Sequence, residues 1–89
     1  MSLRVHFEER RRGSFYRMLA ILTVGGTQYE YFTMIDALAA VRALKEVSDE
    51  ERGTAETAIK GSKVWYSETQ RYPPPEWYSP SPRYEFGAA

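Results

Sequence analysis

Polar and apolar residues alternate near the start of the sequence. Leu3, Val5 and Phe7 fall on one side of this pattern, and Arg4, His6 and Glu8 fall on the other. A period of two is that of a half-buried β-strand. Two further runs, residues 14–24 and 27–33, are rich in β-branched and aromatic residues, which favour strands. The pattern therefore predicts three successive strands.

The connections between these strands set their pairing. Gly25 and Gly26 allow the positive φ angles of a two-residue type I′ turn. That turn predicts Val24 opposite Thr27, Leu22 opposite Tyr29, Ala20 opposite Tyr31 and Met18 opposite Thr33. A first connection over residues 10–13 predicts Phe7 opposite Tyr16, Val5 opposite Met18 and Leu3 opposite Ala20. Both connections put these side chains on one face, which predicts a three-stranded antiparallel meander.

After Thr33 the hydrophobic period becomes that of a helix. Thr33 is a candidate N-cap, with Asp36 three residues later. Met34, Ala37, Leu38, Val41 and Leu44 share one side of this helix and should cover the sheet. The predicted core contains Leu3, Val5, Phe7, Met18, Ala20, Leu22, Leu38, Val41 and Leu44.

A second, short helix is predicted over residues 49–60. Ser48 and Glu51 have the capping-box spacing, and Gly61 is a natural end to the helix. The apolar residues of segment 63–67 predict a short strand or an extended segment that re-enters the core. The predicted fold class is α+β.

The sheet face opposite the first helix carries a second apolar group, formed by Phe15, Leu19, Ile21 and Phe32. This group is too large for a face that contacts only water. We expect it to be covered, either by a segment of this chain or by a partner.

All five prolines lie in the last quarter of the sequence, after residue 72. We therefore divide the chain into a small α+β domain, residues 1–67, and a Pro/aromatic-rich tail or arm, residues 68–89. The tail holds Tyr72, Trp77, Tyr78, Tyr84 and Phe86. A merely flexible linker would be poor in aromatic residues. Two interpretations remain equally open: the tail folds over the apolar sheet face, or it docks on a neighbouring molecule.

Composition excludes several classes of function. The 89 residues include 12 basic and 12 acidic side chains and no cysteine, so a disulfide and a thiolate metal site are ruled out. The longest apolar run is far too short to span a bilayer. We expect a soluble, cytoplasmic protein that makes no membrane contact.

Catalytic residue patterns are missing from the sequence. The single histidine, His6, has no adjacent serine or carboxylate arrangement that would make it a general base. The acidic run at residues 49–51 falls in the first turn of a predicted helix, where negative charge is favoured without any chemistry. We expect no enzymatic activity, no cofactor, no metal and no small-molecule substrate.

An arginine run, Arg10, Arg11 and Arg12, lies at the tip of the first predicted hairpin, with Arg17 nearby. The planar guanidinium group suits phosphate, carboxylate and aromatic surfaces. A solvated turn is an equally good interpretation of the same residues.

The order of three strands and a helix, with Phe32 and Thr33 leading into the helix at Met34, resembles in topology the small DNA-binding modules at the N-termini of phage-type integrases. The resemblance covers residues 3–47. It implies that the outer sheet face would read the major groove. That face carries few cations, since Glu8 and Glu30 offset its arginines.

Two functions follow as hypotheses. The first is a non-enzymatic protein-binding module, an accessory subunit or small inhibitor that docks on itself or on a larger assembly, including the kind encoded by phages and mobile elements. The second is a small nucleic-acid-binding module that uses the sheet and the basic hairpin tip. The residues expected to bind a partner are Arg10, Arg11, Arg12, Arg17, Phe15, Leu19, Ile21, Phe32, Tyr72, Trp77, Tyr78 and Tyr84.

Overall fold

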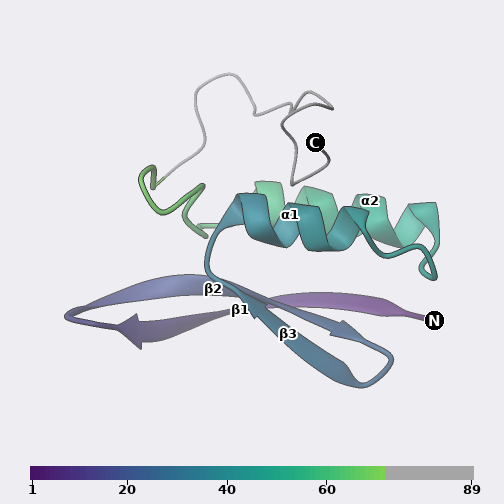
Figure 1. Ribbon diagram of the computed structural model, residues 1–89, viewed down its shortest axis with the longest axis horizontal. Coiled ribbons are helices and arrows are strands. Elements are labelled where there is room, and N and C mark those ends of the chain that lie inside the picture. The colour runs from purple at the N-terminus through teal and green to yellow at the C-terminus, as the bar shows by residue number, and fades with distance from the viewer. Residues whose placement is uncertain (72–89) are drawn as a thin grey trace.

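The fold is a three-stranded sheet covered on one side by two helices (Figure 1). The computed structural model describes residues 1–71, apart from the side chain of Arg12. The sheet is antiparallel, in the order β1-β2-β3. Its strands are β1 (Leu3–Arg12), β2 (Phe15–Val24) and β3 (Thr27–Tyr31), and the helices are α1 (Met34–Arg42) and α2 (Asp49–Lys60). The predicted α+β class and antiparallel meander are confirmed.

The turn between β2 and β3 has the predicted form. Gly25 and Gly26 have φ angles of 56° and 89°, a region that glycine enters without steric cost. The observed register pairs Val24 with Thr27, Leu22 with Tyr29 and Ala20 with Tyr31, as predicted. β3 ends at Tyr31, so the predicted pair of Met18 with Thr33 lies beyond this ladder.

The turn between β1 and β2 differs from the prediction. It consists of Gly13, with a φ angle of 64°, and Ser14. The observed pairs are Phe7 with Ala20, Val5 with Leu22 and Leu3 with Val24, so the predicted register was wrong by four residues. Because four is an even number, every side chain keeps its predicted face. The arginine run consequently forms the last part of β1 rather than the turn.

The core lies between the sheet and the helices, where it was predicted. Leu22, Leu38 and Val41 are at most 1% exposed. Leu3 and Ala20 are also buried, whereas Val5, Phe7, Met18 and Leu44 pack against the core at its margin. None of the helices in residues 1–71 is long and apolar enough to cross a membrane.

Both predicted N-caps are present. The Thr33 hydroxyl accepts a hydrogen bond from the Asp36 amide at 3.3 Å, and the Ser48 hydroxyl accepts one from the Glu51 amide at 3.2 Å. Helix α2 has its predicted bounds, but α1 ends at Arg42, before Leu44. The chain turns there, and this turn allows Val47, which is 3% exposed, to reach the core.

Segment 63–67 re-enters the core, as predicted. Val64 and Tyr66 are buried in it. The Trp65 carbonyl accepts a hydrogen bond from the Met34 amide at 2.7 Å, and the Tyr66 carbonyl accepts one from the Ile35 amide at 3.2 Å. These are the first amides of α1, which have no partner inside the helix. The segment therefore completes the N-terminus of α1.

Candidate binding site at the hairpin end

Charged side chains of β1 and β3 form a bridge across the outer sheet face, opposite the helices. Leu19 and Ile21 on central strand β2 are 0% and 2% exposed. Arg10 on β1 donates to Glu30 on β3 at 2.7 Å, and also to Glu8 at 2.9 Å. Because β2 lies between β1 and β3, the bond between Arg10 and Glu30 must pass over it, and the register places the crossing at Leu19. The stems of such long side chains can cover apolar surface while their charged groups stay in water.

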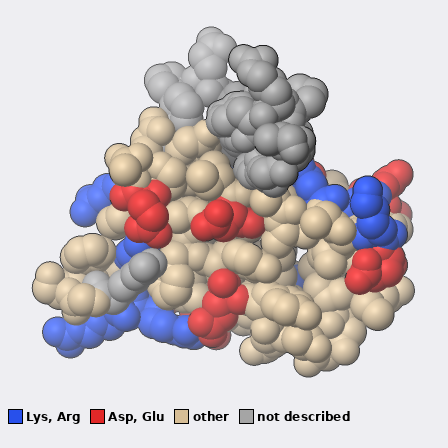
Figure 2. Space-filling view, viewed as in Figure 1, with Lys and Arg blue, Asp and Glu red and all other residues tan. Residues whose placement is uncertain are grey.

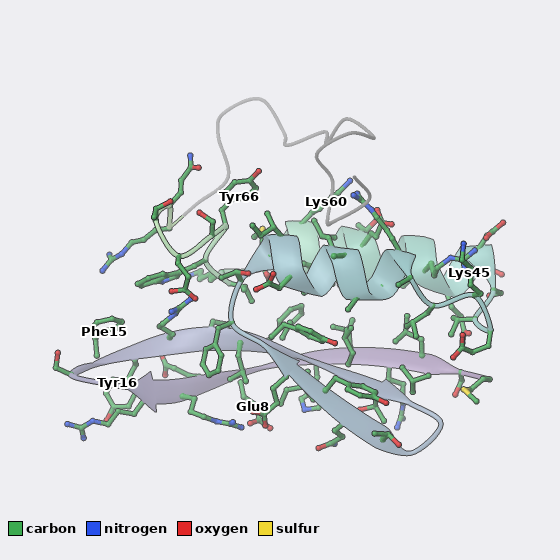
Figure 3. The ribbon with its side chains drawn as sticks, in the orientation of Figure 1. Glu8, Phe15, Tyr16, Lys45, Lys60 and Tyr66 are labelled. Carbon is green, nitrogen blue, oxygen red and sulfur yellow. The ribbon has the colours of Figure 1, made fainter. Side chains whose placement is uncertain are left out.

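This bridge also changes the charge available at the hairpin. The hydrogen bonds to Glu30 and then to Glu8 raise the pKa of the Arg10 guanidinium. Its charge is already paired with two carboxylates. Figure 3 shows Glu8 on the side of the sheet away from the helices.

Arg17 is a buried cation that holds the segment after α2 against the hairpin. It is 3% exposed. Its guanidinium donates to the Phe32 carbonyl at 2.7 Å and to Glu68 at 3.0 Å. The guanidinium carbon lies 3.8 Å from the centre of the Trp65 ring, a cation–π contact that gains strength from desolvation.

Two aromatic side chains are exposed on either side of β2 at this end of the molecule (Figure 3). Phe15 is 45% exposed and stacks on Trp65, with ring centres 5.7 Å apart and an interplanar angle of 15°. Tyr16 is 64% exposed, and the Arg11 guanidinium lies 5.9 Å from its ring centre. The Arg71 guanidinium lies 5.3 Å from the centre of the Trp65 ring. We name these five residues, Arg11, Phe15, Tyr16, Trp65 and Arg71, the hairpin-end cluster.

The cluster keeps two cations that no carboxylate of the described residues neutralises. Arg11 and Arg71 form cation–π contacts but no ion pair with any residue of 1–71. Figure 2 shows basic side chains gathered at this end of the molecule with acidic ones beside them. The surface therefore combines aromatic rings, guanidinium groups and nearby carboxylates rather than a uniformly positive field.

The predicted binding residues have separate positions. Arg11 and Phe15 of the hairpin are exposed, whereas the predicted contacts Arg17, Leu19 and Ile21 are buried and cannot touch a partner in this structure. Arg10 and Phe32 are half-buried. Arg10 donates to Glu30, and the Phe32 ring lies against the guanidinium of buried Arg17. Arg12 belongs to β1. Tyr72, Trp77, Tyr78 and Tyr84 lie outside the described residues, as does any contact of the tail beyond Arg71.

Sequence reasoning missed Tyr16, Trp65 and Arg71 as members of a surface site. Tyr16 was assigned to the core face. It is exposed because the outer part of the hairpin extends past the helices. Trp65 stands between two core residues, and that alternation in an extended segment could have indicated a ring facing away from the core.

Catalytic groups are not brought together in the part of the chain that the structure describes. His6 has a half-exposed side chain, with Nε2 3.5 Å from a Glu8 oxygen. Residues 1–71 contain no group of three metal-ligating side chains close enough to hold an ion.

Contacts of residues 68–71 with the hairpin predict a stability difference between two shortened chains. A chain that ends at Ser67 loses the Glu68 and Arg71 contacts and the hydrogen bond from the Tyr66 amide to the Arg71 carbonyl. Its thermal midpoint should be roughly 4 to 8 °C below that of a chain that ends at Arg71, for a loss of about 1 kcal/mol. Thermal unfolding followed by circular dichroism measures the difference, and equal midpoints would show that these contacts do not stabilise the fold.

Comparison with known proteins gives no match: no family model fits the sequence, and no curated protein and no solved structure is similar to it. Function therefore has to be argued from the chain's own residues.

Proposed function

We propose that this chain is a non-enzymatic protein-binding module that docks on a larger protein through the hairpin-end cluster. The observation that carries this proposal is the exposure of Phe15 and Tyr16 beside two guanidinium groups that lack carboxylate partners among residues 1–71. Tyrosine, tryptophan and arginine are the residues most enriched among those that dominate binding energy at protein interfaces. An accessory subunit or small inhibitor would act through such a surface.

Phe15 and Trp65 of the cluster are held in place before any partner arrives. Phe15 is stacked on Trp65, and Trp65 is fixed in turn by buried Arg17 and by its backbone bond to α1. Side chains that are already ordered lose less conformational entropy on binding. This arrangement favours a docking role over the role of a solvated turn.

The local charges favour a protein over a nucleic acid as the partner. Arg10 is bridged to two glutamates, and Arg17 is buried against Glu68. Glu9 is exposed on the same hairpin. Binding to a phosphate backbone needs several free cations on one surface, whereas a protein surface with a few carboxylates and an apolar patch matches this mixture.

A paired variant tests the proposal. Arg11→Ser combined with Tyr16→Ser removes one guanidinium and one exposed ring, neither of which contributes to the core. Binding of the partner should weaken about tenfold or more, while circular dichroism stays unchanged. The partner is first recovered from an extract of the native host, and its affinity is then measured with purified components.

Lys45→Ser is the matched control, because Lys45 is exposed at the opposite end of the molecule (Figure 3). It should bind as the wild type does. Equal affinity of the paired variant and the control would contradict the proposal. Binding of a random DNA duplex that falls steeply with salt and is lost in the paired variant would instead establish the nucleic-acid function.

A further inference from the structure

The outer edge of β3 carries unpaired backbone groups. In a two-residue hairpin the residues that flank the turn, here Val24 and Thr27, form a hydrogen-bonded pair, and the pairs then alternate. Tyr29 and Tyr31 therefore bond to β2, whereas the peptide groups of Gln28 and Glu30 point away from the sheet. No residue of 1–71 bonds to these outward groups outside the ladder.

An open apolar groove runs beside this edge. It has a volume of about 440 Å³ and lies between the β2–β3 hairpin and the end of α1. Its lining includes Tyr29, Tyr31, Ala40 and Leu44, and Tyr29 is 47% exposed. An added strand would therefore gain backbone hydrogen bonds and apolar contacts at the same edge.

We propose that the added strand is β3 of a second copy of this chain, paired antiparallel about a two-fold axis at Tyr29. This register uses the whole strand and sets Gln28 opposite Glu30 of the copy, twice. Tyr29 meets its own equivalent in a non-hydrogen-bonded pair, where side chains come closest. An axis at Glu30 would instead oppose two carboxylates, which is unfavourable.

The strand is self-complementary in hydrogen bonding as well as in register, because each Glu30 carboxylate faces the side-chain amide of Gln28, which can donate to it. β1, the other edge strand, contacts α2, whereas the edge of β3 has the apolar groove and the exposed Tyr29 beside it. An added strand at β3 therefore gains apolar contacts as well as hydrogen bonds, and the pair of copies forms one continuous sheet.

A single introduced cysteine can locate the two-fold axis. The chain has no cysteine of its own, so any disulfide must join the introduced residues of two copies. Residues directly opposite in a non-hydrogen-bonded pair have Cα atoms about 4.5 Å apart, within the range of a disulfide. Under mild oxidation the full-length Tyr29→Cys chain should form a covalent dimer much faster than His6→Cys, the matched exposed position on β1. A rate for Tyr29→Cys no higher than that of His6→Cys would overturn the proposal.

A charge series at Gln28 tests the register, since Gln28 is exposed and each change leaves the β2–β3 ladder intact. Gln28→Lys puts a cation opposite Glu30 in both symmetry-related pairs of the dimer, so the dimer should become about two- to thirtyfold tighter. Gln28→Glu should weaken the dimer by a similar factor. Sedimentation equilibrium of each full-length variant gives the dissociation constants. Monomer mass for the wild type at every concentration, or the same constant for both variants, would overturn the proposal. These outcomes are independent of the hairpin-end cluster, whose variants should leave self-association unchanged.

Discussion

Replacing Leu22 or Leu38 by alanine is expected to lower the free energy of unfolding by about 2 to 5 kcal/mol. Both side chains are at most 1% exposed. Leu22 of the sheet and Leu38 of α1 belong to the same core between the sheet and the helices. A small domain has a total stability of only about 5 to 15 kcal/mol. Either change should therefore remove a large share of it, and chemical denaturation followed by circular dichroism gives the size of the loss.

Thr57→Ala supplies the control for these core variants, because Thr57 is exposed on α2. A surface change of this kind should alter the free energy of unfolding by no more than about 0.5 kcal/mol. Leucine variants that unfold at the wild-type denaturant concentration would show that the core does not lie between the sheet and α1.

Arg17→Met should be almost as damaging, with a loss of about 2 to 4 kcal/mol. Methionine keeps much of the aliphatic stem but removes the guanidinium that lies against Trp65. The Phe32 carbonyl then loses its 2.7 Å charge-assisted bond, and the Trp65 ring loses the cation that lies 3.8 Å from its centre. Denaturation measures the loss, and the tryptophan emission should shift to longer wavelength as water reaches the Trp65 ring.

Two companion variants separate the contributions of Arg17. Arg17→Lys retains the charge but not the planar group, so it should recover only part of the lost stability. Glu68→Gln should cost less than about 1 kcal/mol, because the Glu68 side chain is 57% exposed and water screens its ion pair. If Glu68→Gln were as destabilising as Arg17→Met, the ion pair and not the stacked guanidinium would hold this end together.

The fold was predictable where local signals agree with the hydrophobic pattern. Gly25 and Gly26 defined one register, and Thr33 and Ser48 marked both helix starts. The other turn was misplaced because Gly13 follows three arginines, which were interpreted as a loop although they continue the strand. The register error was four residues, an even number, so each side chain was still predicted on the correct face of the sheet.

The surface was less predictable than the core, because it depends on contacts between distant parts of the chain. Leu19 and Ile21 have the sequence pattern of an exposed apolar group, yet both are buried, and a bridge from Arg10 to Glu30 crosses β2 at Leu19. Arg17 has the pattern of a surface cation, yet segment 65–68 closes over it. Residues 17 and 68 are far apart in the sequence, so alternation along one strand gives no sign of this contact.

Photo-cross-linking at Tyr16 tests the claim that the hairpin-end cluster binds a protein. A photoreactive phenylalanine derivative replaces Tyr16 in one sample and Lys45 in another, and each is irradiated in an extract of the native host. A discrete covalent adduct with one protein from position 16, and none from position 45, is the predicted result. Nucleic-acid adducts at position 16, or the same protein adducts from both positions, would contradict the claim.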